Sequence, residues 1–340
     1  MKKLVIIFLL FSSTFFSQIR LIQNIEARKT ISLNGKWNVI VDPYETGYYT
    51  YRLTPDQNGF FKNQKQKNKY DRIEYDFDKS EKLIVPGDWN TQKEKLFFYE
   101  GTIWYKKSFN YEKKQNKRVF IYFGAVNYNS KVYLNGEFVG EHVGGFTPFK
   151  FEITDKINSG LNFVILKVDN KRLPEGVPTI NTDWWNYGGI TRDVYLVETN
   201  STFIDDYFIQ LEKNSSNKIS GWVKLDGNIF NDIKIKIPEL KFDTSLTPNK
   251  NGYCQFIIDC SPVLWSPKNP KLYDVIIQHD DEVIKDKIGF RKIEVKENKI
   301  FLNDKEIFLR GISLHEETPV KSSRANSKKD ERKLLSMDKE

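Results

Sequence analysis

The feature that most constrains the fold is a series of short apolar and aromatic runs between residues 30 and 198, separated by turn signals. Asn135-Gly136 stands between two such runs, and this pair is typical of a two-residue hairpin turn. No stretch of this region has sustained helical periodicity. Many short strands with Gly and Asn turns predict a β-sandwich of the jelly-roll kind. The clearest runs are residues 35–39, 103–105, 118–123, 131–134 and 162–168.

A second series of strand-like runs follows between residues 201 and 292, with examples at 204–209, 221–225 and 272–277. A length of about 90 residues suits one immunoglobulin-like β-sandwich. Thr199-Asn200-Ser201 is a polar break after an apolar run. We therefore predict a mainly β protein with a jelly-roll domain at 24–198 and an immunoglobulin-like domain at 199–292.

The composition indicates which kinds of binding partner to expect. The formal charge of +8 arises from 53 Lys and Arg against 45 Asp and Glu, and the surplus is spread along the chain. Without a nucleic-acid module motif, this pattern indicates a solvated surface, so no nucleic-acid partner is expected. The 25 Phe, 17 Tyr and 7 Trp favour strands and sites where a sugar can stack. We assign Trp37, Trp89 and Trp104 to the core.

The amino end has the layout of a secretory signal peptide. Met1-Lys2-Lys3 precedes an apolar run at 4–11, and small residues follow at Ser12, Ser13 and Ser17. We predict a signal peptide at 1–17, with its cleavage point open, and an exported protein that is periplasmic or secreted. The apolar run is too short to span a bilayer comfortably, so no membrane association is expected after its removal.

Two cysteines, Cys254 and Cys260, lie six positions apart in a strand-like run. On one extended strand their side chains would be ~20 Å apart, well beyond the reach of a disulfide bond. We expect two buried free thiols. Neither cysteine has a His or a second Cys at metal spacing, so no metal site and no cofactor are predicted.

Seven stretches occur in a fixed order, and together they resemble glycoside hydrolase family 2, the β-galactosidase and β-glucuronidase family. The resemblance implies a sugar-binding jelly-roll domain, an immunoglobulin-like domain and then a catalytic (β/α)₈ barrel. The stretches are 33–37 (LNGKW), 85–90 (VPGDWN), 99–105 (YEGTIWY), 132–137 (VYLNGE), 144–149 (GGFTPF), 186–194 (NYGGITRDV) and 308–316 (FLRGISLHE).

A complete barrel needs ~250 residues, whereas about 48 follow Lys292. We expect residues 293–340 to be a truncated start of this barrel: a hairpin with Asn303-Asp304 as its turn, the first strand, and part of the first helix from Lys329. In the family, the acid/base and nucleophile Glu residues lie at later barrel strands, and no position here matches either.

Because no position matches the acid/base or the nucleophile Glu, other carboxyl groups have to be considered as catalytic residues. Retaining glycosidases need two carboxyl groups ~5–5.5 Å apart. Glu316 and Glu317 are adjacent on one chain, so their side chains point in different directions. We interpret them as solvated loop carboxylates, assign no catalytic residue, and expect this chain alone to be inactive.

Five residues are candidates for carbohydrate contacts. The resemblance places His315 after the first barrel strand, beside the sugar, and brings the loop at 182–189 toward the active site. Trp184 and Trp185 can stack on a pyranose ring while Asp183 and Asn186 hydrogen-bond its hydroxyls. Alternatively, the two Trp side chains pack between domains and His315 is structural.

Three hypotheses for function follow. The first is the amino-terminal part of an exported family 2 β-glycosidase, which hydrolyses O-glycosidic bonds by a retaining mechanism in the complete enzyme. The second is a non-catalytic carbohydrate-binding protein, and the third is a scaffold marked by oligomerisation without sugar binding. Residues 186–192 are nearer the β-glucuronidase version of the motif, but the sequence leaves the sugar, the linkage, any metal dependence and the oligomeric state open. It also leaves open whether the chain is a natural product or a truncated gene fragment.

Overall fold

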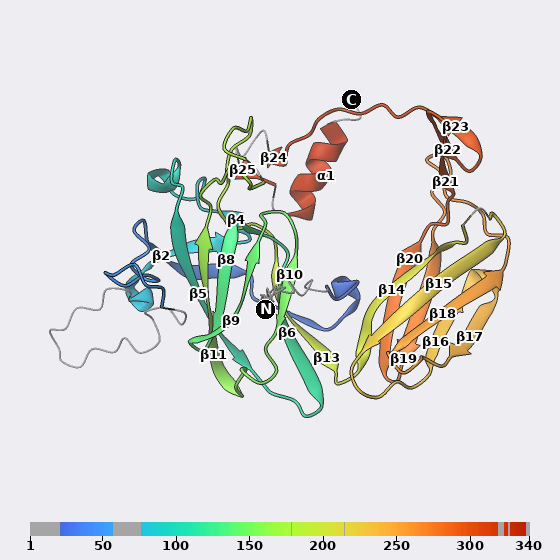
Figure 1. Ribbon diagram of the computed structural model, residues 1–340, viewed down its shortest axis with the longest axis horizontal. Helices are drawn as coiled ribbons and strands as arrows, with labels where there is room; N and C mark the ends of the chain where they lie inside the picture. The colour runs from blue at the N-terminus through green and yellow to red at the C-terminus, as the bar shows by residue number, and fades with distance from the viewer. Residues whose placement is uncertain are drawn as a thin grey trace, which may run out of the picture.

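The computed structural model describes residues 21–56, 76–177, 179–213, 215–318, 323–325 and 327–337. The predicted signal peptide at 1–17 lies outside the described residues. Two β-sandwiches stand side by side, and the carboxyl-terminal segment passes from the second back to the first (Figure 1). Among the described residues, no helix has the length and apolar character needed to cross a membrane.

The first sandwich consists of a six-stranded sheet facing a four-stranded sheet, and the pairings within both sheets are antiparallel. The six-stranded sheet has the order β3 (Glu81–Val85), β2 (Gly35–Val41), β5 (Thr102–Tyr111), β11 (Gly160–Asp169), β8 (Asn129–Leu134) and β9 (Glu137–Val143). The four-stranded sheet has the order β1 (Thr30–Ser32), β13 (Val194–Asn200), β6 (Lys117–Phe123) and β10 (Phe149–Glu152).

The three tryptophans assigned to the core from the sequence are fully buried in this sandwich, which confirms that assignment. Each indole N–H is also satisfied: Trp37 donates to Leu33 O at 2.8 Å, Trp89 to Tyr99 O at 3.2 Å and Trp104 to Asp42 Oδ2 at 2.9 Å. These rings therefore fill the core without leaving a buried donor unpaired.

The predicted hairpin at Asn135-Gly136 is confirmed. Strand β8 ends one residue before this pair and β9 begins one residue after it. Both turn residues have positive φ values, 52° for Asn135 and 85° for Gly136. This is the geometry that matches the twist of a two-residue hairpin, and Asn and Gly adopt it most readily.

Short elements at one end of the first sandwich carry several of the sequence motifs. A small sheet pairs β12 with β4 on one side and β7 on the other. These elements are β4 (Gly87–Asp88), β7 (Val126–Asn127), β12 (Gly189–Ile190) and the 3₁₀ turn η3 (Glu94–Leu96); two further 3₁₀ turns are η1 (Ile25–Ala27) and η2 (Phe77–Lys79).

The second sandwich has seven strands in two sheets, as expected for an immunoglobulin-like domain. One sheet is β14 (Phe203–Leu211), β15 (Lys218–Asp226) and β18 (Tyr253–Asp259). The other is β17 (Phe242–Leu246), β16 (Ile233–Ile237), β19 (Tyr273–His279) and β20 (Glu282–Ile288), with the 3₁₀ turn η4 (Pro238–Leu240) between β16 and β17.

The two cysteines of this domain are free, as predicted. Cys254 is buried in β18, whereas Cys260 follows the end of that strand and is only half-buried. The expectation that both thiols are buried is therefore correct for Cys254 alone. The expectation for Cys260 assumed that the in-and-out alternation of side chains continues to this residue, but the strand ends at Asp259.

An ion pair joins the two sandwiches at their junction. The Arg28 guanidinium, which is almost fully buried, contacts Glu282 Oε1 at 2.6 Å and also donates to Ile204 O. Glu282 accepts a hydrogen bond from Ile204 N at 2.7 Å. The residues just before β1 thus tie the first sandwich to β14 and β20 of the second.

After the second sandwich, a small antiparallel sheet contains β21 (Ile293–Lys296), β22 (Lys299–Leu302) and β23 (Lys305–Ile307). Its second turn is the predicted Asn303-Asp304 pair, again with positive φ at both positions. The chain then returns to the first sandwich, where β24 (Glu317–Thr318), β25 (Ser323–Arg324) and the helix α1 (Lys328–Met337) lie beside it (Figure 1).

The segment that the resemblance assigns to the first barrel strand is extended and exposed. Residues 308–314 form no strand here, and Phe308 and Ile312 are 84% and 72% exposed. A parallel barrel strand is normally paired on both edges and covered on both faces. The described part of the chain supplies neither set of neighbours.

This exposure predicts a protease-sensitive site. Arg310 is exposed within the unpaired segment, so brief trypsin treatment of the native protein should cleave after it. Mass spectrometry of the fragments checks the position, and Arg310→Gln should remove that cut. A native protein resistant to trypsin at Arg310 would contradict the exposed state of this segment.

His279 predicts a pH dependence in the second sandwich. Its ring is fully buried, and neither ring nitrogen has a hydrogen-bond partner among the described residues. Burial lowers the pKa of His279, although Asp280 and Asp281 oppose this effect. The unfolded chain therefore takes up a proton more readily than the native protein, and stability falls as the pH drops below about 6.5.

Urea titrations of the full chain at pH 7 and pH 5 measure this contribution. His279→Leu should show a smaller loss of unfolding free energy over that interval than the native protein. Equal losses in the two proteins would contradict the buried neutral imidazole.

Candidate functional site

A pocket of about 250 Å³ lies where the returning segment meets the end of the first sandwich. One wall comes from the loop before β12 and the other from the residues around β24. The two walls are distant in sequence and meet only in the folded chain. The lining residues are Asn127, Phe146, Trp184, Trp185, Asn186, Tyr187, Leu314, His315, Glu316, Glu317 and Arg324.

Four of the five candidate residues from the sequence line this pocket: Trp184, Trp185, Asn186 and His315. The Trp184 and His315 rings meet edge to face, with their centroids 5.1 Å apart. Asp183 is exposed and lines a neighbouring open groove, on which Arg172 also lies. The structure thus brings four candidates together and leaves Asp183 outside the pocket.

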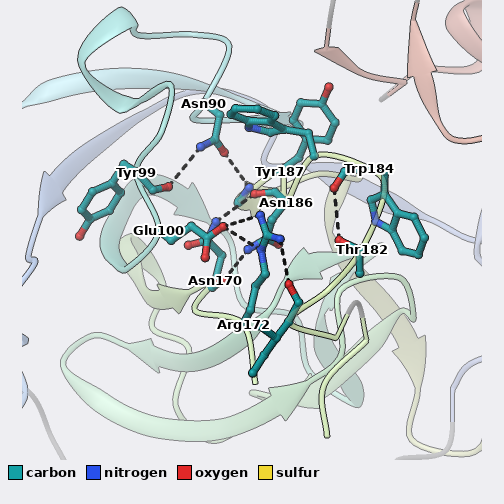
Figure 2. A network of polar contacts seen from close by, with 12 residues as sticks. Asn90, Tyr99, Glu100, Asn170, Arg172, Thr182, Trp184, Asn186 and Tyr187 are labelled. Carbon is teal, nitrogen blue, oxygen red and sulfur yellow. Dashed lines mark hydrogen bonds and ion pairs between the residues drawn. The ribbon is translucent and has the colours of Figure 1, made fainter. Parts of the chain in front are cut away.

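A buried asparagine, Asn90, lies beside the pocket loop and is hydrogen-bonded to it (Figure 2). Its Nδ2 lies 3.0 to 3.1 Å from the carbonyl oxygens of Leu96, Phe97 and Tyr99. Its Oδ1 accepts a hydrogen bond from Gly188 N at 2.9 Å. One side chain therefore ties the residues after η3 to the loop before β12.

Gly188 has to be a glycine at this point. A Cβ on it would lie 2.2 Å from the Trp89 ring and 2.6 Å from Asn170 Nδ2. Those atoms belong to the buried core and to the asparagine contacts, so they cannot move aside cheaply. The close approach lets the Gly188 amide reach Asn90.

Asn170 and Asn186 bind each other's backbone. Asn186 Nδ2 donates to Asn170 O at 2.7 Å, and Asn170 Nδ2 donates to Asn186 O at 3.1 Å (Figure 2). Asn170 Oδ1 also accepts from Gly101 N at 2.9 Å. Both ends of the buried Asn186 amide have protein partners, since its Oδ1 accepts from Asn127 Nδ2 at 3.1 Å. Asn186 is therefore part of the pocket wall, and its hydrogen bonds hold the pocket loop in place.

Asn127 is a pocket residue that the sequence reasoning missed. Its Nδ2 donates to Asn186 Oδ1 and, at 2.6 Å, to Tyr187 O. Its Oδ1 is buried and has no hydrogen-bond partner among the described residues. A Cβ on Gly145 would come within 2.2 Å of this oxygen. No local pattern around Asn127 distinguishes it, because its partners are about 60 residues away.

Glu316 is exposed, as expected of a solvated loop carboxylate, but it is also held by two arginines that the sequence reasoning did not foresee. Arg192 pairs with Glu316 Oε1, and Arg324 Nε lies 2.9 Å from Glu316 Oε2. Arg324 is 4% exposed, donates to Thr191 Oγ1 at 3.0 Å and covers the Phe146 ring at 4.6 Å. Burial lowers the pKa of Arg324, and the Glu316 carboxylate opposes that shift. These contacts fix the returning segment to the first sandwich.

Glu317 is also in contact with the pocket loop. Its Oε1 accepts a hydrogen bond from Trp185 N at 3.3 Å. Burial raises the pKa of Tyr187, and the nearby Glu317 carboxylate adds to the rise. The phenol therefore stays protonated and can donate a hydrogen bond at neutral pH.

Residues 30–200 match the model of the sugar binding domain of glycosyl hydrolases family 2, and residues 202–291 match a second model of the same family. The chain belongs to glycoside hydrolase family 2. The resemblance seen in the sequence motifs is confirmed.

Curated relatives agree with this membership. The chain is 32% identical over 257 residues to a putative β-glucuronidase of Formosa agariphila. The matched region covers 70% of this chain and 31% of that relative. It is 31% identical to a β-galactosidase of Thermoanaerobacter pseudethanolicus, over 73% of this chain and 37% of that protein. This family 2 chain thus spans about a third of the length of these relatives.

Solved structures of the family share the fold. The β-glucuronidase of Ruminococcus gnavus has a TM-score of 0.68 and 25% identity, over 89% of this chain and 52% of that one. A β-glucuronidase of Bifidobacterium dentium, in complex with coumarin-3-O-glucuronide, has a TM-score of 0.75 at 21% identity, over 92% of this chain and 56% of that one.

The role of Asn90 in this family 2 chain predicts a large effect of Asn90→Ala. The substitution leaves several buried backbone groups without their partner, each at a cost of about 1–3 kcal/mol. We expect the free energy of unfolding to fall by about 3 kcal/mol, measured by urea titration with tryptophan fluorescence. Asn181→Ala, at an exposed position of the same loop region, is the control. Equal stability of the two variants would contradict the assigned role.

Proposed function

We propose that this chain supplies the sugar-recognition part of an exported family 2 β-glycosidase. The observation that supports the proposal most strongly is the pocket that Trp184, Trp185 and His315 line together. These residues come from two segments about 130 positions apart. Family membership adds the substrate class, a carbohydrate with a β-glycosidic bond.

The lining groups suit a pyranose ring. The Trp184 and Trp185 rings offer apolar faces on which the C–H face of a sugar can stack. Around them, His315, Tyr187 and Glu317 provide donors and acceptors for hydroxyl groups. A few polar groups around an aromatic wall fix the orientation of a small ligand.

For the complete enzyme we propose the retaining mechanism, in which one Glu protonates the leaving group and a second attacks the anomeric carbon. In the family these carboxyl groups belong to later barrel strands, and no position of the 340 residues matches either of them. Glu316 forms ion pairs with Arg192 and Arg324, and Glu317 binds the Trp185 amide. We therefore propose that the 340-residue chain binds sugar without turnover. Export follows from the signal-like residues 1–17, and the proposed location is the periplasm or the exterior.

The charges of the pocket favour a neutral sugar for this chain by itself. Glu316 is paired with both Arg192 and Arg324, and the neighbouring Glu317 is a second carboxylate, without an ion-pair partner among the described residues. A uronic acid would add a third carboxylate to this group. Methyl β-galactoside should therefore bind at least as well as methyl β-glucuronide.

The alternative function is a non-catalytic carbohydrate-binding protein. It is favoured by one observation: the described residues form the pocket walls without any further chain segment. The two proposals share the pocket and differ in whether a catalytic barrel acts on the bound sugar.

Titration of the full chain with the two methyl glycosides, followed by tryptophan fluorescence and by NMR of the sugar, tests the pocket. Trp184→Ala should weaken binding at least tenfold, since it removes one stacking wall. Trp222→Ala, in the second sandwich, is the matched control and should bind as the native chain does.

Two results would count against the proposal. Unchanged affinity in Trp184→Ala would place the sugar elsewhere. Release of p-nitrophenol from aryl β-glycosides by the purified chain, at a rate above that of a mock preparation, would overturn the absence of turnover.

A further inference from the structure

Two phenylalanines beside the pocket are exposed although the first sandwich has ample core. Phe98 is 82% exposed and Phe97 is 41% exposed, directly after η3. Their rings meet edge to face with centroids 4.9 Å apart. The fold gains little from a ring as exposed as that of Phe98, which points to a role in binding.

Both rings also contact Trp185. The centroid of the Trp185 ring lies 4.8 Å from that of Phe97 and 5.6 Å from that of Phe98. Because Trp185 also lines the sugar pocket, the three rings form a surface that is continuous with the pocket rim. We call Phe97, Phe98 and Trp185 the aromatic ledge.

The backbone of the aromatic ledge is fixed on both sides. Phe97 O accepts from Asn90 Nδ2 at 3.1 Å, and Phe97 N donates to Glu94 O at 3.0 Å. Trp185 N donates to Glu317 Oε1. A ligand that binds here does not have to order these backbone segments, so little affinity is lost to entropy.

We propose that the aromatic ledge is a second sugar-ring subsite, which binds the residue adjacent to the one in the pocket. Exposed aromatic rings stack on the C–H faces of pyranoses, and the shared Trp185 places the two sites next to each other. The occupant is therefore a β-linked oligosaccharide. This inference rests on the proposed function, because it needs the first ring in the pocket.

The test compares methyl β-galactoside with β-1,4-galactobiose on the full chain, by calorimetry or NMR titration. The native chain should bind galactobiose at least fivefold more tightly than the methyl glycoside. Phe98→Ala should remove this preference and leave the affinity for methyl β-galactoside unchanged. Phe98→Trp should keep the preference, because it retains a stacking ring.

Tyr44→Ala is the matched control, since Tyr44 is 86% exposed and lies on another loop of the same domain. It should retain the preference for galactobiose. Urea titration checks that Phe98→Ala is folded, as expected for a side chain with so little burial.

The outcomes separate the two proposals. The subsite at the aromatic ledge is overturned, and the pocket stands, if methyl β-galactoside binds but galactobiose binds no more tightly. The same conclusion follows if Phe98→Ala keeps the higher affinity for galactobiose. If neither sugar binds, both proposals fail. If Phe98→Ala instead converts a dimer into a monomer in sedimentation, the ledge is a contact between copies of the chain and the subsite is overturned.

Discussion

The candidate site depends on a set of buried amide hydrogen bonds. Asn90, Asn170 and Asn186 are each 4% exposed or less, and together they pair the residues after η3 with the loop before β12. Buried backbone groups in such loops are costly unless each finds a partner. Asparagine serves well here because one side chain both donates and accepts. The aromatic rings of the pocket and ledge are held in place by these contacts.

The candidate site also requires that the chain returns to the first sandwich after it has formed the other one. Residues 308–314 cross without strand pairing, and Arg324 then binds Glu316, Thr191 and the Phe146 ring. Only this return brings His315 and Glu317 against Trp184 and Trp185. The pocket therefore belongs to two distant segments, so the jelly-roll residues by themselves would lack one wall of it.

The sequence predicted much of the fold, because strand runs and turn pairs are local signals. Asn135-Gly136 and Asn303-Asp304 turned out to be hairpin turns with the expected positive φ values. The candidate site was harder to predict from the sequence. Trp184, Trp185 and His315 were grouped only through the family resemblance, whereas Asn127 and Phe98 carry no local pattern and acquire their setting from contacts distant in sequence. Asp183 lies in a neighbouring groove although it precedes Trp184, and this depends on loop geometry that spacing does not encode.

The most direct test of this account is native-state hydrogen exchange at the amides of Gly188 and Gly101, which donate to Asn90 and Asn170. The account predicts that both amides exchange only by the global unfolding that exposes the central strands β5 and β11, with the same free energy of opening. Exchange of these two amides at a much lower free energy, while the strand amides stay protected, would contradict it. The pocket loop would then open independently of the sandwich, and the asparagine contacts would not be what holds the site.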